Sequence, residues 1–242
     1  MYYNNASVCD PTRRTPPVRA PMSRIRPEKR DLLEQLATLG KALGHPYRLE
    51  LLEYVAQGER TVEALTELTR LPVATVSQHL QHLRRAGLVR PRREGKYVHY
   101  RITDDNVVGL LAALRGVAEH NIVEMQQLLE SYFEGSQTLE AIHADDLTAR
   151  LRDGLVTLLD VRPEQEYRTG HLPGAINIPA AELERRLRDL PPDREVVAYC
   201  RGPYCALAHK AVRVLREHGL QARRLADGYP EWRAAGLPVE EH

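Results

Sequence analysis

Apolar residues in the first half of the chain recur at three- and four-residue steps, the spacing typical of helices that bury one face. This spacing predicts one helix beginning at Glu28 and a second through Leu49–Val55, with Gly44-His45-Pro46 between them. Thr61 is expected to cap a short third helix, and a fourth is expected from about Val73 to Arg85. Four helices in close succession therefore open the ordered part of the chain.

After the fourth helix, apolar and polar residues alternate as in strands, and the helical spacing of apolar residues then returns. Leu88–Arg92 and Lys96–Ile102 are short β-like runs separated by Glu94-Gly95, which predicts a hairpin. A long helix follows over about residues 104–133. It carries more apolar positions than a single surface helix needs, so we expect a partner helix to cover it.

Beyond residue 135, short apolar runs alternate with helical segments. The expected strands are 155–161, 175–178, 196–199 and 222–225, and the expected helices are 144–153, 180–189 and 205–218. Strands that alternate with helices predict a central parallel sheet with helices on both faces. The fold class is thus two domains, a mainly α winged helix-turn-helix with a β-hairpin wing followed by an α/β domain.

Length and composition agree with this division, because 242 residues exceed the usual size of one domain. Residues 1–27 hold five prolines and five arginines and few large aliphatic side chains, and we expect them to form a disordered tail. The expected domains are 28–134 and 139–242, joined by a linker at 135–138. No apolar run is long enough to span a membrane, and three cysteines are too few for a disulfide scaffold. A cytoplasmic protein is expected.

The charge is divided unequally between the halves. Residues 1–103 carry 18 Lys and Arg against 10 Asp and Glu, whereas residues 141–242 carry 15 against 16. Within Arg70–Arg101 there are eight basic residues and one acid, Glu94. A basic cluster confined to one segment is typical of nucleic-acid binding, although a solvated basic face would give the same count.

The fourth helix has polar side chains that suit the edges of bases in a major groove. Its predicted outward residues are Thr75, Ser77, Gln78, His79, Gln81 and His82. Basic residues around them are expected to neutralise phosphates of double-stranded DNA, namely Arg84, Arg92, Arg93 and Lys96. A DNA operator is therefore the expected partner of this half.

The stretch ALGHPYRLELLEYVAQGERTVEALTELTRLPVATVSQHLQHLRRAGLVRPRREGKYVHYRI closely resembles the ArsR/SmtB family of bacterial repressors. The resemblance covers about residues 29–133 and implies a recognition helix in ATVSQHLQHLRRAGLV, a wing in RREGKYVHY, and a homodimer paired through the last helix. The paired cysteines of the family's metal sensors are absent from TVEALTELTR. His120 and Glu124 have a spacing that can share a metal, but such a pair is more often a surface contact, and no metal site or cofactor is expected.

Cys200 ends an apolar run and opens the loop Cys200-Arg201-Gly202-Pro203-Tyr204-Cys205, after which a helix begins. A thiol there lies among outward-facing backbone amides at a helix N-terminus, which favour the thiolate. Arg201 is expected to add a positive charge beside it. The alternative is a buried, inert cysteine.

LLDVRPEQEYRTGHLPGAINIP, VVAYCRGPYC and LADGYPEWRAAGLPV resemble the rhodanese domain in order and spacing over about residues 139–240. The resemblance implies that Cys200 accepts sulfane sulfur as a persulfide from thiosulfate, polysulfide or a protein donor. It also places Asp160 and Arg162 beside the active loop as supporting polar residues. Phosphatases of this fold use a loop one residue longer that ends in arginine, whereas Ala206 stands there, so sulfur transfer is favoured.

Cys205 has two interpretations. Five residues after Cys200, it could attack a Cys200 persulfide and give a disulfide or a polysulfide bridge, or it could simply be a small residue that starts the helix.

The sequence as a whole predicts a dimeric transcriptional regulator, a repressor, whose second domain senses or processes reactive sulfur. Whether that domain turns over as a sulfurtransferase is left open. One alternative is a sulfurtransferase whose winged helix serves for localisation or partner binding. An inert rhodanese domain used only for binding, or repression that responds to metals, would also fit.

Overall fold

The computed structural model describes residues 27–133 and 141–241. The contacts divide the chain into two units between Ala37 and Thr38. The predicted linker at 135–138 and the predicted tail lie outside the described residues, apart from Pro27, which starts the first helix.

The predicted opening helices are present. They are α1 (Pro27–Leu43), α2 (Pro46–Ala56), α3 (Val62–Thr69) and α4 (Val73–Arg85). Thr61 caps α3 as predicted, since its hydroxyl accepts a hydrogen bond from the amide of Ala64 at 3.1 Å. α3 ends at Arg70, which adopts a left-handed conformation with φ 56°. The turn to α4 therefore relies on an αL residue that is not glycine.

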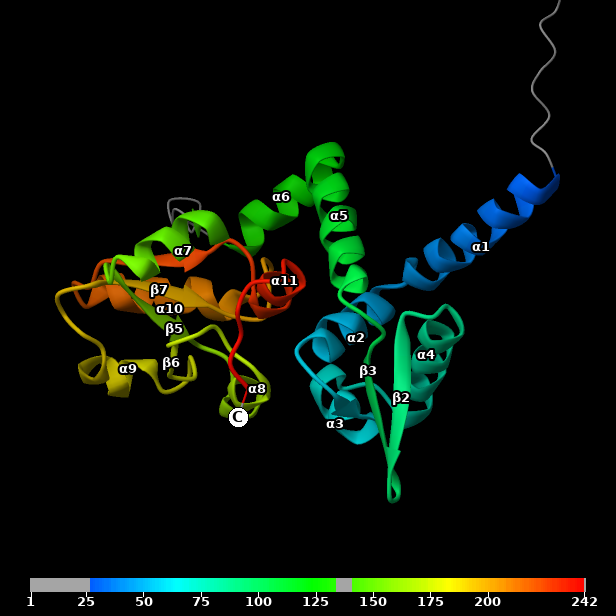
Figure 1. Cartoon of the computed structure of the whole chain (residues 1–242), viewed down its shortest axis with the longest axis horizontal. Helices are drawn as coiled ribbons and strands as arrows, with labels where there is room; N and C mark the ends of the chain where they lie inside the picture. The colour runs from blue at the N-terminus through cyan, green and yellow to red at the C-terminus, as the bar shows by residue number, and fades with distance from the viewer. Residues whose placement is uncertain (1–26, 134–140, 242) are drawn as a thin grey trace, which may run out of the picture. The chain divides into compact units, whose positions relative to one another are not determined.

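The wing is an antiparallel hairpin of β2 (Val89–Glu94) and β3 (Tyr97–Ile102) (Figure 1). In its register Val89 lies opposite Ile102. Gly95 lies in the turn with φ +58°, a conformation that glycine adopts without strain. A third strand, β1 (Arg60–Thr61), pairs with β3 and was not predicted. Two residues are too few for an apolar pattern to show.

The long helix predicted over 104–133 is in fact two helices, α5 (Asn106–Asn121) and α6 (Val123–Tyr132). Ile122 separates them in an extended conformation, with φ −112° and ψ 107°. Because Ile122 is apolar, it continues the helical pattern, and the sequence gives no sign of the break. Many apolar side chains of this segment are exposed: Leu110, Leu114, Val117, Ile122, Val123, Leu128 and Tyr132.

The second half contains a five-stranded parallel sheet in the order β4-β8-β7-β5-β6. Its strands are β4 (Ala141–Ile142), β5 (Val156–Asp160), β6 (Ile176–Asn177), β7 (Glu195–Tyr199) and β8 (Ala222–Leu225). All five residues of β5 are buried, as expected for a central strand covered on both faces.

Helices cover both faces of this sheet (Figure 1). One core contains residues of α9 (Leu183–Arg186) and α10 (Ala206–Glu217), and a 3-10 turn, η2 (Leu187–Asp189), follows α9. The other contains residues of α7 (Ala144–Arg152) and α11 (Tyr229–Ala234). A further helix, α8 (Glu164–Thr169), follows β5. The predicted fold class, a winged helix-turn-helix followed by an α/β domain, is confirmed.

No helix in the described part of the chain is both long and apolar enough to cross a membrane.

Candidate functional site

The loop from Cys200 to Cys205 lies where β7 ends and α10 begins. Its backbone is held on the turn before α11, because the amide of Tyr229 donates to the carbonyl of Cys200 at 3.1 Å. The approach is so close that a Cβ on Gly228 would collide with the backbone nitrogen of Gly202. Glycine is therefore required at position 228 to seat the loop.

The two cysteines of the loop are both free thiols but differ in exposure. Cys200 is only 2% exposed, whereas Cys205 is half-buried and lines a cavity of about 290 Å³. The amide of Cys205 donates to the carbonyl of Gly202 at 3.1 Å, which turns the loop back on itself. The Cys200 thiol consequently donates to the carbonyl of Cys205 at 3.4 Å.

The environment gives the two thiols different acidities. Burial, with the neighbouring Cys205, raises the pKa of Cys200. A hydrogen bond from the Cys200 thiol lowers the pKa of Cys205 to about 6, and the backbone amides of Arg201 and Leu207 act in the same direction. The pair therefore favours the ionised form at Cys205 and the protonated form at Cys200. The backbone amides of Gly202 and Ala208 would favour a charge on Cys200.

Arg201 lies beside the thiols, and its positive charge contributes to lowering the pKa of Cys205. The guanidinium is not free, however, because it forms a bidentate ion pair with Glu166 of α8, with contacts of 2.8 to 3.1 Å. The carboxylate of Glu166, which is 3% exposed, also lies 3.6 Å from Arg60. Arg201 thus anchors the loop to α8 as well as adding charge to it.

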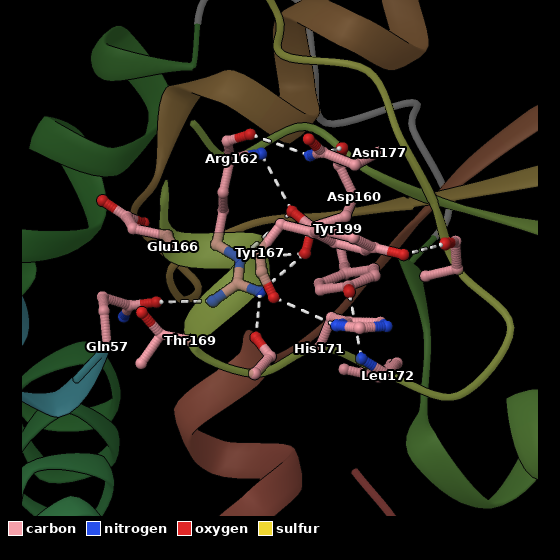
Figure 2. A network of polar contacts seen from close by, with 12 residues as sticks. Gln57, Asp160, Arg162, Glu166, Tyr167, Thr169, His171, Leu172, Asn177 and Tyr199 are labelled. Carbon is pink, nitrogen blue, oxygen red and sulfur yellow. Dashed lines mark hydrogen bonds and ion pairs between the residues drawn. The ribbon is translucent and has the colours of Figure 1, made fainter. Parts of the chain in front are cut away.

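Asp160 and Arg162 form a fully buried ion pair at the end of β5 (Figure 2). The guanidinium of Arg162 donates to both carboxylate oxygens at 2.6 to 3.1 Å and to the carbonyl of Gly170 at 2.7 Å. Burial opposes the charge on Arg162, but the hydrogen bonds and charge of Asp160 outweigh it and raise the pKa of the guanidinium. The pair thus fixes the carboxyl end of β5 and the turn after α8.

Further polar contacts extend from this pair (Figure 2). The side-chain amide of Asn177 donates to the carbonyls of Asp160 and Arg162, both at 3.0 Å. The hydroxyl of Tyr199 accepts from the amide of Leu172 at 3.1 Å, which holds the next turn against β7. The network therefore stiffens the framework from which the loop extends.

Gln57, at the end of α2, is a site residue that sequence reasoning missed. Gln57 is 1% exposed, and its side chain donates to the carbonyl of Arg201 at 2.9 Å. It also accepts from Arg162 at 3.3 Å (Figure 2). The loop residue Tyr204 donates to Glu119 of α5 at 2.6 Å. Residues of the winged helix therefore bind the loop directly. The sequence carries no signal for this, because a polar residue before Gly58 is typical of an exposed helix end.

Helix α4, which was predicted to contact bases, presents only part of the predicted polar set. Gln78 and His82 are exposed, as is Arg84. The other predicted side chains are half-buried, namely Thr75, Ser77, His79 and Gln81. The ring of His79 lies against that of His45, with centroids 4.5 Å apart, and Gln81 donates to the hydroxyl of Tyr100 at 3.2 Å. These internal contacts leave the exposed residues as the stronger candidates for base contacts.

Arg92, Arg93 and Lys96 are all exposed on the wing. Arg92 is paired with Glu59 at 2.7 Å and with Glu94 at 2.8 Å, and these hydrogen bonds raise the pKa of its guanidinium. Arg93 and Lys96 make no ion pair with a described carboxylate. No described carboxylate therefore balances the charges of Arg93 and Lys96, whereas Glu59 and Glu94 balance that of Arg92.

The break at Ile122 removes the helical spacing that related His120 to Glu124, since the two residues now belong to different helices. Among residues 27–133 and 141–241, no group of three or more His, Cys, Asp or Glu is arranged to hold a metal.

Comparison with known proteins finds the same two regions. A helix-turn-helix domain matches residues 43–92, and a rhodanese-like domain matches residues 143–235. The HTH-type transcriptional regulator Rv0324 of Mycobacterium tuberculosis is 46% identical over 213 residues, which span 88% of this chain and 93% of the relative.

Two solved structures are each similar to one region. A homodimeric winged helix-turn-helix DNA-binding domain from Mycobacterium bovis, a possible ArsR-family regulator, is 41% identical and covers 43% of this chain and 95% of its own, with a TM-score of 0.39. A rhodanese-related protein from Thermoplasma volcanium is 29% identical and covers 43% of this chain and 99% of its own, also with a TM-score of 0.39.

Proposed function

Because this chain belongs to the family of helix-turn-helix transcriptional regulators that join an ArsR-type domain to a rhodanese-like domain, we propose that it is a repressor regulated by reactive sulfur. In this proposal Cys200 takes up sulfane sulfur, and its state alters the affinity of the winged helix for operator DNA. The observation that carries the proposal is Gln57, a buried residue of the winged helix that hydrogen-bonds to the loop containing Cys200.

The uptake step uses the two thiols together. As Cys200 attacks a sulfane sulfur of polysulfide or thiosulfate, its proton passes to the thiolate of Cys205. An S–S bond of the donor breaks, and the remainder leaves as a shorter polysulfide or as sulfite. The amides of Gly202 and Ala208 favour negative charge at Cys200 as it develops. Cys200 then carries a persulfide, and the charge on Cys205 has been neutralised.

Coupling to DNA follows from what holds the loop. An added sulfur atom at a thiol that is 2% exposed has little free space, so the loop must shift to accommodate it. The carbonyl of Arg201 and the hydroxyl of Tyr204 belong to that loop and bind Gln57 and Glu119 of the winged helix. Sulfur on Cys200 can change DNA affinity only if some contacts differ between the sulfur-loaded and sulfur-free states. In this proposal the contacts of Gln57 and Glu119 with the loop are the ones that differ.

Dimerisation is proposed through α5 and α6. Their exposed apolar side chains include Leu114 at 41%, Val117 at 62% and Leu128 at 64% exposure. Complete burial of a fully exposed large aliphatic side chain is worth about 1.5–3 kcal/mol, and covering these partly exposed side chains is worth a fraction of that. Packing of these two helices against the same helices of a second copy would remove these side chains from water.

The test combines mass spectrometry with DNA binding. Wild-type protein and Cys200→Ser are treated with inorganic polysulfide, analysed by intact mass, and titrated onto a duplex that the protein selects from a random pool. Wild-type protein should gain sulfur on the peptide that contains Cys200 and change its DNA affinity, whereas the DNA affinity of Cys200→Ser should not respond to polysulfide. Equal affinity of treated and untreated wild-type protein would refute the regulation.

A sulfurtransferase is the second candidate, favoured by the cavity beside Cys205, which gives a small acceptor room to reach the loop. Multiple turnovers of sulfur to added cyanide, with no sequence-selective DNA binding, would support this function instead.

A further inference from the structure

The loop holds a second thiol in a position suited to react with the first. The turn closed by Cys205 and Gly202 brings residue 205 back to the Cys200 thiol, which donates to the Cys205 carbonyl at 3.4 Å. Cys205 lines the cavity, while Cys200 lies in the core beside α10. Any sulfur that reaches Cys200 through this cavity therefore passes Cys205.

We propose that Cys205 resolves the persulfide on Cys200, so that sulfur uptake ends in an internal Cys200–Cys205 disulfide and released sulfide. This inference rests on the proposed function, because it begins from the persulfide. It adds a stable oxidised state of the loop and a product, hydrogen sulfide.

The step balances without another reagent. The proton of Cys205 passes to the outer sulfur of the persulfide, and the Cys205 thiolate attacks Sγ of Cys200. A new S–S bond forms between the two cysteines as the S–S bond of the persulfide breaks. The outer sulfur leaves as HS⁻, having gained two electrons, and the two cysteine sulfurs together lose two electrons as they become a disulfide. The sulfane sulfur is therefore the oxidant, and molecular oxygen is not involved.

The local environment favours this reaction over release to a thiol in solution. Attack within one loop is effectively unimolecular, which gives reacting groups effective concentrations far above those of dissolved thiols. The amides of Arg201 and Leu207 lower the pKa of Cys205 and so favour the ionised form that attacks. A hydroxyl at position 205 would keep the polarity of the site but could not form the bond.

The experiment follows the fate of one sulfur atom. Fully reduced full-length protein carrying Cys9→Ser, which leaves only the two loop thiols, is treated anaerobically with one equivalent of inorganic polysulfide. Sulfide, intact mass and non-reducing tryptic peptides are then measured. Trypsin cuts after Arg201, which Gly202 follows, so Cys200 and Cys205 fall on separate peptides that only a covalent bridge can join. The same protein with Cys205→Ser added is the matched control.

Protein with both loop cysteines should lose the mass of two hydrogens, release sulfide and give the bridged peptides. Cys205→Ser should instead retain the mass of one added sulfur on Cys200 and give no bridge. If the protein with both cysteines retains the added sulfur and shows no bridge, resolution by Cys205 is wrong while sulfur uptake stands. If it gains no sulfur and forms no bridge, sulfur uptake at Cys200 is itself refuted.

Discussion

Removing the charge of Asp160 should destabilise the protein far more than the small change in side-chain size suggests. In Asp160→Asn the buried guanidinium of Arg162 loses a carboxylate that it contacts at 2.6 to 3.1 Å. Its other acceptors, the carbonyl of Gly170 and the side-chain oxygen of Gln57, are neutral. The side chains of Asp160 and Arg162 are both 0% exposed, so water does not replace the lost partner. Leaving one charge of a buried pair without its partner costs about 3–5 kcal/mol.

The measurement is the free energy of unfolding from urea titration, together with the thermal midpoint. For a chain of this size the loss corresponds to a fall of roughly 6–20 °C in the midpoint. Asp189→Asn is the matched control, because Asp189 pairs with Arg186 at a similar 2.8 Å but is 48% exposed, and its loss should cost less than about 1 kcal/mol. Equal effects of the two substitutions would refute the claim that burial makes the Asp160 pair important.

Three further outcomes are expected. The rate of alkylation of Cys205 in the wild-type protein should rise with pH around a midpoint of about 6. Cys200→Ala should raise that midpoint toward about 8.5, because the thiol that donates to Cys205 is lost. An unchanged midpoint would contradict the role of Cys200. Arg93→Ala should reduce the salt dependence of DNA binding by about one charge, measured by fluorescence anisotropy, and Arg92→Ala by less, since Glu59 and Glu94 already balance Arg92. Leu114→Glu should give monomers in light scattering, and a persistent dimer would place the interface elsewhere.

The elements that the sequence predicts are those with a repeated apolar pattern. α4 and the five buried residues of β5 carry such patterns, and both appear as predicted. α8 and α11 were not predicted, because each has six residues and is positioned by contacts distant in sequence. The break at Ile122 is a different case, since a backbone change at an apolar residue leaves no trace in periodicity.

The candidate site could be predicted from sequence only where its reactive residues lie together in one short segment. The loop from Cys200 to Cys205 has its two thiols and helix N-terminus in consecutive residues, so its position can be predicted from sequence. The expected thiolate at Cys200 does not agree with the structure, because burial raises the pKa of Cys200 and Cys205 is the more acidic thiol. Residues that contact the loop from distant parts of the sequence cannot be predicted in this way. Glu166 is a charged residue in a short polar helix, a pattern typical of a solvated surface, yet it is 3% exposed and pairs with Arg201.

That ion pair also bears on which reactions the loop favours. A phosphate ester or other oxyanion needs a guanidinium with free N–H groups directed at it. Arg201, the arginine of the loop, already directs its Nε and one terminal nitrogen at Glu166. What the loop offers its substrate is instead a shared proton between two thiols and backbone amides around both sulfurs. A sulfane sulfur, which is attacked by a thiolate while the remainder of the donor leaves as an anion, matches that set of groups, and a phosphate ester does not.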